Sequence, residues 1–171
     1  MDFIELAKKR YSVRKYDSRP VEDEKLAKIL EAAAAAPTAH NNQPLRFFII
    51  KSAEMREKFK SVTDCTFGAP VLLALCYDTE ETWKNDLAPG YDAGEVDTGI
   101  VSAHIMLEAA DLGLGTCAVR WFRDDVMKEV LALPENIVPG LIITLGYPAE
   151  NSHPAKLHTL RRDPQEVCTE L

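Results

Sequence analysis

The stretch from Ala32 to Ile50 reads AAAAAPTAHNNQPLRFFII. Its alanine run favours a helix, which must stop at Pro37 because proline lacks an N–H and clashes with the preceding turn. The apolar run after Pro44 is rich in β-branched and aromatic residues and predicts a buried strand. The polar loop between the two prolines carries hydroxyl and amide groups that can bind a planar polar ligand. An ordinary helix-to-strand turn explains the same residues equally well.

The chain of 171 residues has the size and composition of one globular domain, with 46% hydrophobic and 27% charged residues. A net charge of -7 and the lack of a basic patch argue against a nucleic-acid partner. No apolar run approaches the roughly 20 residues of a membrane span, and we find no signal-peptide segment, so we expect no membrane association. The scattered cysteines lack metal-type spacing and indicate a reducing, cytoplasmic setting without a metal site: Cys65, Cys76, Cys117 and Cys168.

Hydrophobic patterning predicts alternating helices and strands. The clearest helix spans 21–36, because its apolar residues recur at the spacing of one helical face: Leu26, Ile29, Leu30 and Ala33. Further helices are expected at 2–9, 53–62, 95–112 and 124–133, the first with a capping box formed by Asp2 and Glu5. Strands are expected at 47–50, 69–77, within 113–122 and at 138–147.

The predicted helix at 95–112 is apolar on most sides, so it must be a central core helix or one shared with a second subunit. We interpret His104 within it as a packed histidine with satisfied hydrogen bonds, and Gly113 as the glycine that stops the helix. The polar segment 78–94 reads as a mobile surface segment or lid. Its Trp83 and Tyr91 fit local packing better than ligand contact.

Residues 10–14 read Arg-Tyr-Ser-Val-Arg. Alternate residues of an extended backbone share a face, so Arg10, Ser12 and Arg14 would point the same way. Arginine's planar guanidinium matches phosphate oxygens, which makes a phosphate site one interpretation. A solvated basic strand edge is the other, and these residues by themselves slightly favour it.

Four motifs in this order resemble the nitroreductase family of FMN-dependent oxidoreductases, in its compact form. They are Arg10-x-Ser12-x-Arg14, Pro37-Thr38-Ala39-x-Asn41-x-Gln43-Pro44, Gly113-Leu114-Gly115-Thr116-Cys117 and Leu145-Gly146-Tyr147-Pro148. The resemblance covers essentially the whole chain. It implies an α+β fold with a central, mainly antiparallel sheet flanked by helices. It also implies an interlocked homodimer with two FMN sites at the interface. With no domain boundary in the sequence, we expect a single domain over 1–171, in which 78–94 is a candidate lid segment and 149–171 a C-terminal tail.

The resemblance also implies which residues bind FMN. One subunit would supply the ribityl-phosphate segment: Arg10, Ser12 and Arg14. Its partner would supply the loop against the flavin: Pro37, Thr38, Ala39, Asn41 and Gln43. Backbone N–H groups of Val119, Arg120 and Trp121 would lie near flavin N5, and Lys156 and His158 of the tail would complete the phosphate site.

Three residues depart from the family pattern. Leu45 stands where the family often has Trp. His158 stands where the family usually has Arg, which leaves Arg161 and Arg162 as further candidates for the phosphate site. Arg120 and Trp121 are bulkier than the small residues frequently found beside the flavin, which argues for a narrower pocket.

The implied activity is transfer of hydride from NADH or NADPH through FMN to a nitroaromatic, a quinone or a similar conjugated small-molecule acceptor. No side chain need act as acid or base, because the flavin carries the chemistry. A flavin-binding protein without significant turnover is the main alternative. Cysteine hydrolase chemistry from Cys117 with His40 or His104 is the least favoured, because nothing nearby in the sequence would lower the pKa of this thiol.

Overall fold

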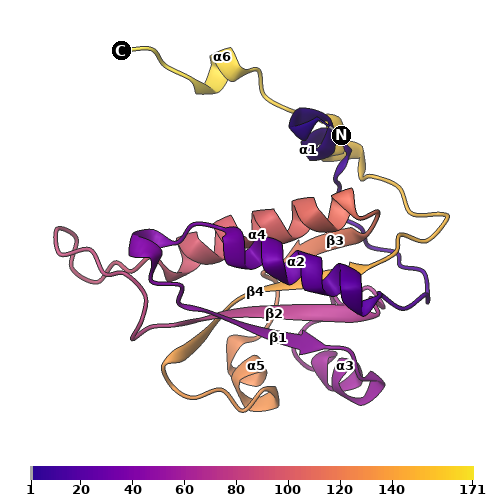
Figure 1. Ribbon diagram of the computed structural model, residues 1–171, viewed down its shortest axis with the longest axis horizontal. Helices are drawn as coiled ribbons and strands as arrows, with labels where there is room; N and C mark the ends of the chain where they lie inside the picture. The colour runs from indigo at the N-terminus through magenta and orange to yellow at the C-terminus, as the bar shows by residue number, and fades with distance from the viewer. Residues whose placement is uncertain (1) are drawn as a thin grey trace.

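The computed structural model describes residues 2–171, so residue 1 of the predicted domain lies outside the described part. A central sheet contains β1 (Leu45–Ile50), β2 (Val71–Asp78), β3 (Gly115–Val119) and β4 (Ile137–Gly146). The strand order is β1-β2-β4-β3 and each neighbouring pair is antiparallel. One face of the sheet is covered by α2 (Asp23–Ala35) and α4 (Gly94–Asp111), and the other by α3 (Ala53–Phe59) and α5 (Asp124–Val130) (Figure 1). The predicted α+β fold is confirmed.

The strand β2 lies inside the sheet, and every residue of it is buried. Its alternate side chains point to opposite faces. Leu73 and Leu75 pack in the core beneath α2 and α4, whereas Leu72 and Ala74 pack in the core beneath α3 and α5. Burial on both faces explains why this strand is a continuous apolar run rather than an alternating one.

The helix α4 buries one side and leaves the other open. Val101, Ile105 and Ala109 are at most 2% exposed and pack in the core, whereas Val96, Gly99 and Ala103 on the opposite side are exposed. Small and apolar residues of α4 therefore extend onto a side of the helix that nothing else among residues 2–171 covers. His104 Nδ1 lies 2.9 Å from the carbonyl oxygen of Ile100, which confirms a histidine with a backbone partner.

Several predicted helix ends are confirmed or corrected. Gly113 stops α4 with φ of +77°, and the Leu114 N–H donates to the Ala109 carbonyl. The predicted capping box is wrong: Asp2 makes no side-chain cap bond, since this end of the helix is exposed and water can satisfy the free N–H groups. The helix expected over 124–133 ends at Val130, because Ala132 adopts a left-handed φ of +50°. The helix expected at 21–36 is shorter at both ends, whereas the one expected at 53–62 begins as predicted and ends earlier, at Phe59.

The N-terminal helix lies beside the first part of the C-terminal tail. The N-terminal helix α1 (Phe3–Lys9) and the short helix η2 (Lys156–Thr159) sit side by side, away from the sheet (Figure 1). His158 Nε2 lies 3.1 Å from the Lys8 carbonyl oxygen, and its ring meets the Tyr11 ring edge-on at 6.2 Å. Beyond them the tail continues through α6 (Pro164–Val167). Large apolar side chains here remain exposed: Phe3, Ile4, Leu157, Leu160 and Val167. Across residues 2–171, none of the helices has the length and apolar character needed to span a membrane.

Candidate functional site

The segment 10–14 runs along β3 in an extended conformation. Ser12 forms a parallel bridge with Thr116, and the Val13 N–H donates to the Thr116 carbonyl oxygen over 2.9 Å. Val13 is 1% exposed and points into the protein. Its neighbours Ser12 and Arg14 therefore point to the opposite side, as the alternation predicted.

The close approach of this segment to β3 depends on Gly115. A Cβ at Gly115 would lie 2.5 Å from Val13 Cγ2, a separation that real Cβ atoms essentially never show. The glycine therefore makes room for Val13, and through Val13 it positions the arginines on either side.

Cys117 of β3 follows Thr116, the residue that pairs with Ser12, and its thiol is buried. Burial raises the pKa of Cys117, and the nearby charge of Arg14, followed by Ser12 and Arg10, opposes that rise. The Arg14 guanidinium lies 6.0 Å from the centre of the Phe67 ring. Because burial is the largest effect, the thiol stays protonated at neutral pH. This argues against cysteine nucleophile chemistry at Cys117.

The C-terminal tail is fastened beside the same segment. The Ala149 N–H donates to the Lys15 carbonyl oxygen over 3.0 Å, and the Tyr11 hydroxyl donates to Ser152 Oγ over 3.2 Å. With His158 against Lys8 and Tyr11, these contacts bring η2 to the N-terminal end of segment 10–14. Of the predicted tail residues, His158 therefore lies beside the segment that carries the predicted arginines.

The loop from Thr38 to Gln43 has an unusual backbone. His40 and Asn41 have φ of +57° and Gln43 has φ of +52°, all in the left-handed region that favours glycine. Within the loop, Thr38 Oγ1 accepts a hydrogen bond from the Gln43 N–H over 3.0 Å. Strained backbone of this kind persists only where surrounding contacts hold it, and such strain often accompanies ligand sites.

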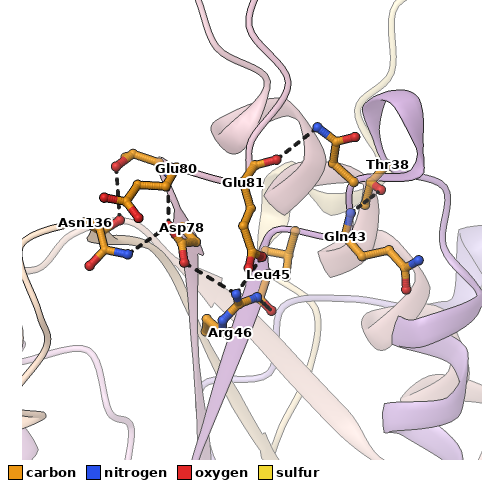
Figure 2. A network of polar contacts seen from close by, with 10 residues as sticks. Thr38, Gln43, Leu45, Arg46, Asp78, Glu80, Glu81 and Asn136 are labelled. Carbon is orange, nitrogen blue, oxygen red and sulfur yellow. Dashed lines mark hydrogen bonds and ion pairs between the residues drawn. The ribbon is translucent and has the colours of Figure 1, made fainter.

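A polar network connects this loop to the edge of the sheet (Figure 2). Asn42 Nδ2 donates to the Glu81 carbonyl oxygen over 2.9 Å, and the Glu81 carboxylate pairs with Arg46 at 2.5 Å. Arg46 also reaches Asp78 at 3.4 Å, and Asn136 donates to the other Asp78 oxygen at 2.9 Å. The Glu80 N–H, followed by the Asn136 side chain, lowers the pKa of Asp78.

A second anchor of the loop comes from α4. The Ala39 N–H donates over 2.9 Å to Oδ1 of Asp97, a residue in the first turn of that helix. Asp97 is 1% exposed. The Arg10–Arg14 segment, in contrast, pairs with Thr116, beyond the other end of α4. Since α4 has 18 residues, the two predicted FMN-binding segments of one chain stand at opposite ends of a helix about 27 Å long.

The chain leaves β3 through Arg120 and Trp121. The Trp121 carbonyl accepts a hydrogen bond from Thr63 Oγ1 over 2.6 Å, and its indole is 78% exposed. Arg120 forms two hydrogen bonds with Asp124, at 2.8 and 3.0 Å. A cavity of about 530 Å³ opens here, lined by residues 60–64 and 120–123.

The fold and the motifs have counterparts in known proteins. The model of the Nitroreductase family matches residues 7–65 and 62–147. The chain belongs to the nitroreductase family. A relative from Methanothermobacter thermautotrophicus, named as a candidate NADH dehydrogenase/NAD(P)H nitroreductase, is 35% identical over 158 residues, which are 88% of this chain and 80% of the relative.

Solved structures of the family superpose over most of the chain. A nitroreductase family protein from Clostridium difficile 630 has a TM-score of 0.92 at 36% identity, over 99% of this chain and 98% of the other. An FMN-dependent nitroreductase from Clostridium difficile R20291 has a TM-score of 0.74 at 27% identity, over 94% of this chain and 99% of the other.

For this member of the family, the sequence alone predicts both candidate FMN-binding segments but not the residues that hold one of them in place. The alternation in 10–14 and the two prolines around the loop were readable signals. Asp97, Arg46 and Asn136 gave no such signal, because each acts on residues far away in the chain: Asp97 and Ala39, for instance, are 58 positions apart.

Proposed function

We propose that this chain is an FMN-dependent oxidoreductase that passes hydride from NADH or NADPH to a conjugated small-molecule acceptor such as a nitroaromatic or a quinone. The observation that carries the proposal is the cluster formed by Arg10, Ser12 and Arg14 beside β3, with the tail fastened next to it. Family membership and the names of the relatives agree with this reaction class.

The residues of this cluster suit the phosphate of FMN. An acidic protein must gather cations locally to bind a phosphate dianion, and Arg10, Arg14 and Lys156 supply them. The Ser12 hydroxyl can donate to a phosphate oxygen. Because segment 10–14 pairs with β3, its side chains are held in place before any ligand arrives, which lowers the ordering cost of binding.

The flavin ring requires a second subunit in this proposal. The loop formed by Pro37, Thr38, Ala39, Asn41 and Gln43 lies at the opposite end of α4 from the arginines of its own chain. It is therefore assigned to the FMN bound by a partner chain. The exposed apolar side of α4 and the uncovered apolar residues of α1 and the tail support a homodimer, since large exposed apolar surfaces mark interaction sites.

When bound, FMN would take hydride from the nicotinamide and pass it to the acceptor, and the protein would supply binding, orientation and electrostatics. The loop presents a hydroxyl and amides that can pair with the donors and acceptors of the flavin pyrimidine edge. Backbone N–H groups of Val119, Arg120 and Trp121 are assigned to the region of flavin N5. His158 is assigned to the phosphate site with Lys156.

The acceptor would enter beside the exposed Trp121 indole. An indole at this position can stack on a planar acceptor and limits its size. The chain is proposed to act as one domain over 1–171, with 78–94 as a lid and 149–171 as the tail that joins the phosphate site. A cytoplasmic location is proposed as well, in keeping with the unpaired thiols of all four cysteines.

Anaerobic titration tests the proposal directly. The purified protein is reconstituted with FMN, desalted, and titrated with NADH and with NADPH while the flavin absorbance is followed. We expect bound flavin, prompt bleaching by at least one nicotinamide, and reoxidation by members of a panel of nitroaromatics and quinones.

Each other outcome has a defined meaning. A folded protein that retains no FMN would contradict the proposal. Retained flavin that dithionite bleaches but neither nicotinamide reduces would favour a flavin-binding protein without turnover. Sedimentation of the FMN-loaded protein as a monomer would contradict the shared site.

A further inference from the structure

Asp97 has a buried carboxyl group that forms no salt bridge among residues 2–171. It is 1% exposed, and one of its oxygens accepts the Ala39 N–H over 2.9 Å. Among residues 2–171, no donor reaches its other oxygen, Oδ2. Removing a carboxylate from water is costly unless it is fully paired, so a half-satisfied one needs a reason to be there.

The loop that this carboxylate holds is the strained one. Three of its residues carry left-handed φ angles without being glycine, as described above. Two other hydrogen bonds that hold the loop are expected to contribute less, because they are neutral and solvent-exposed. The Thr38–Gln43 contact is between neutral groups within the loop, and Asn42 binds a carbonyl of an exposed residue. The bond from Ala39 to Asp97 is the buried one, and it joins the loop to a helix that lies 58 positions further along the chain.

We infer that Asp97 is a positioning residue whose buried carboxylate holds the Thr38–Gln43 loop in the strained shape that contacts FMN. This inference rests on the proposed function. Asp97 itself touches neither cofactor nor acceptor. It acts through the Ala39 N–H, at the residue just before the left-handed turn begins, and so holds the start of that turn against the first turn of α4.

The unpaired Oδ2 indicates that this side chain is present for the bond made by its other oxygen. A side chain that only filled space would be better apolar at this position, because burial of an unpaired oxygen destabilises the fold. The free energy lost at Oδ2 is offset only if the bond through Oδ1 secures something else. The strained loop is the feature that this bond secures.

Three variants separate positioning from folding. Asp97→Ala removes the acceptor, whereas Asp97→Asn keeps an oxygen acceptor for the Ala39 N–H and removes the charge. Ser102→Ala serves as a control, since Ser102 is 5% exposed on the same helix and donates only to Gly99 of that helix. Each variant is measured for FMN dissociation constant, thermal unfolding without FMN, and amide hydrogen exchange at Ala39.

For Asp97→Ala we expect FMN to bind about 10- to 100-fold more weakly, the range for leaving a buried hydrogen-bond donor, here the Ala39 N–H, without its acceptor. Exchange of the Ala39 amide should become faster in the FMN-free protein. Asp97→Asn should bind FMN to within about threefold of wild type. Ser102→Ala should have the wild-type affinity for FMN, because the hydrogen bond that it removes does not reach the loop.

Equal FMN affinity and equal Ala39 exchange in wild type and Asp97→Ala would overturn the inference. The same follows if Ser102→Ala weakens FMN binding as much as Asp97→Ala does. Should Asp97→Ala not fold, the comparison of Asp97→Asn with wild type decides, because loss of Ala39 protection in that variant also counts against an acceptor role. If the wild-type protein binds no FMN, the proposed function is contradicted. Hydrogen exchange at the Ala39 amide would then still test whether Asp97 holds the loop.

Discussion

The two segments assigned to FMN are held in place in opposite ways. Segment 10–14 is positioned by its backbone, which bonds to Thr116 of β3 in an ordinary extended conformation. The Thr38–Gln43 loop is positioned by side chains, those of Thr38, Asn42 and Asp97, against a backbone with three left-handed residues. The first segment stores no strain and the second does.

This difference indicates how each segment responds to change. A strand-like segment keeps its shape when an outward side chain is replaced, so substitutions there report on the ligand contact itself. A loop held by side chains loses its shape when one anchor is removed, so substitutions there report on preorganisation. The five predictions below test this contrast and run from the largest expected effect to the smallest.

Arg14→Ala should weaken FMN binding by about 10- to 100-fold while thermal stability stays close to wild type, because a charge-assisted phosphate contact is lost and the backbone bonds remain. Fluorescence titration of FMN measures the dissociation constant. Arg56→Ala, which removes the same charge from α3, provides the control. Equal retention of FMN in Arg14→Ala and Arg56→Ala would contradict the assignment of Arg14.

Gly115→Ala should destabilise the fold by about 1–3 kcal/mol, because its Cβ would overlap Val13 Cγ2. FMN binding should weaken too, since segment 10–14 must move away from β3. The double variant with Val13→Ala removes the overlapping group and should recover part of the affinity. Chemical denaturation together with FMN titration of both variants checks this; additive losses would show that the contact does not matter.

Thr38→Val should weaken FMN binding by about 3- to 10-fold, the effect expected from loss of one neutral hydrogen bond, here the one that Thr38 Oγ1 accepts from the Gln43 N–H. Thr38→Ser keeps the hydroxyl and should bind FMN like wild type. Isothermal calorimetry distinguishes the two variants. Similar affinities for Val and Ser at this position would remove Thr38 from the anchors of the loop.

Glu81→Gln should cost less than about 1 kcal/mol, because its pair with Arg46 is partly exposed to solvent and such pairs contribute little. The Asn42 contact uses the backbone of Glu81 and would remain. FMN affinity should therefore change by less than about threefold. A larger loss would mean that the network in Figure 2 positions the loop more strongly than its exposure suggests.

The pH dependence of stability should carry a small contribution from Asp78. The Glu80 N–H and then the Asn136 side chain lower its pKa in the folded state. Its contribution is therefore fully present above the ordinary aspartate pKa of about 3.9 and is lost as the pH falls through the lower folded value. Denaturation between pH 5 and about pH 2 should show a shallower acid limb for Asp78→Asn than for Glu31→Gln, which removes an exposed carboxyl from α2. Parallel curves would contradict this role.

The amino-acid sequence alone determined the architecture and the order of the functional segments. Strands and helices could be predicted because their apolar periods of about 2 and 3.6 residues are local properties of the chain. The common face of Arg10, Ser12 and Arg14 followed from the same alternation, and Gly113 marked a helix end because it is a glycine.

Only the tertiary structure decided what holds the loop and where the two segments stand. Nothing in the local sequence predicts left-handed φ angles at His40, Asn41 and Gln43, or at Ala132 where α5 ends, because these residue types do not require them. The bond between Ala39 and Asp97 joins positions 58 residues apart, and the separation of the two segments depends on how α4 lies across the sheet. Such contacts arise from packing between distant parts of the chain, which periodicity and motifs do not encode.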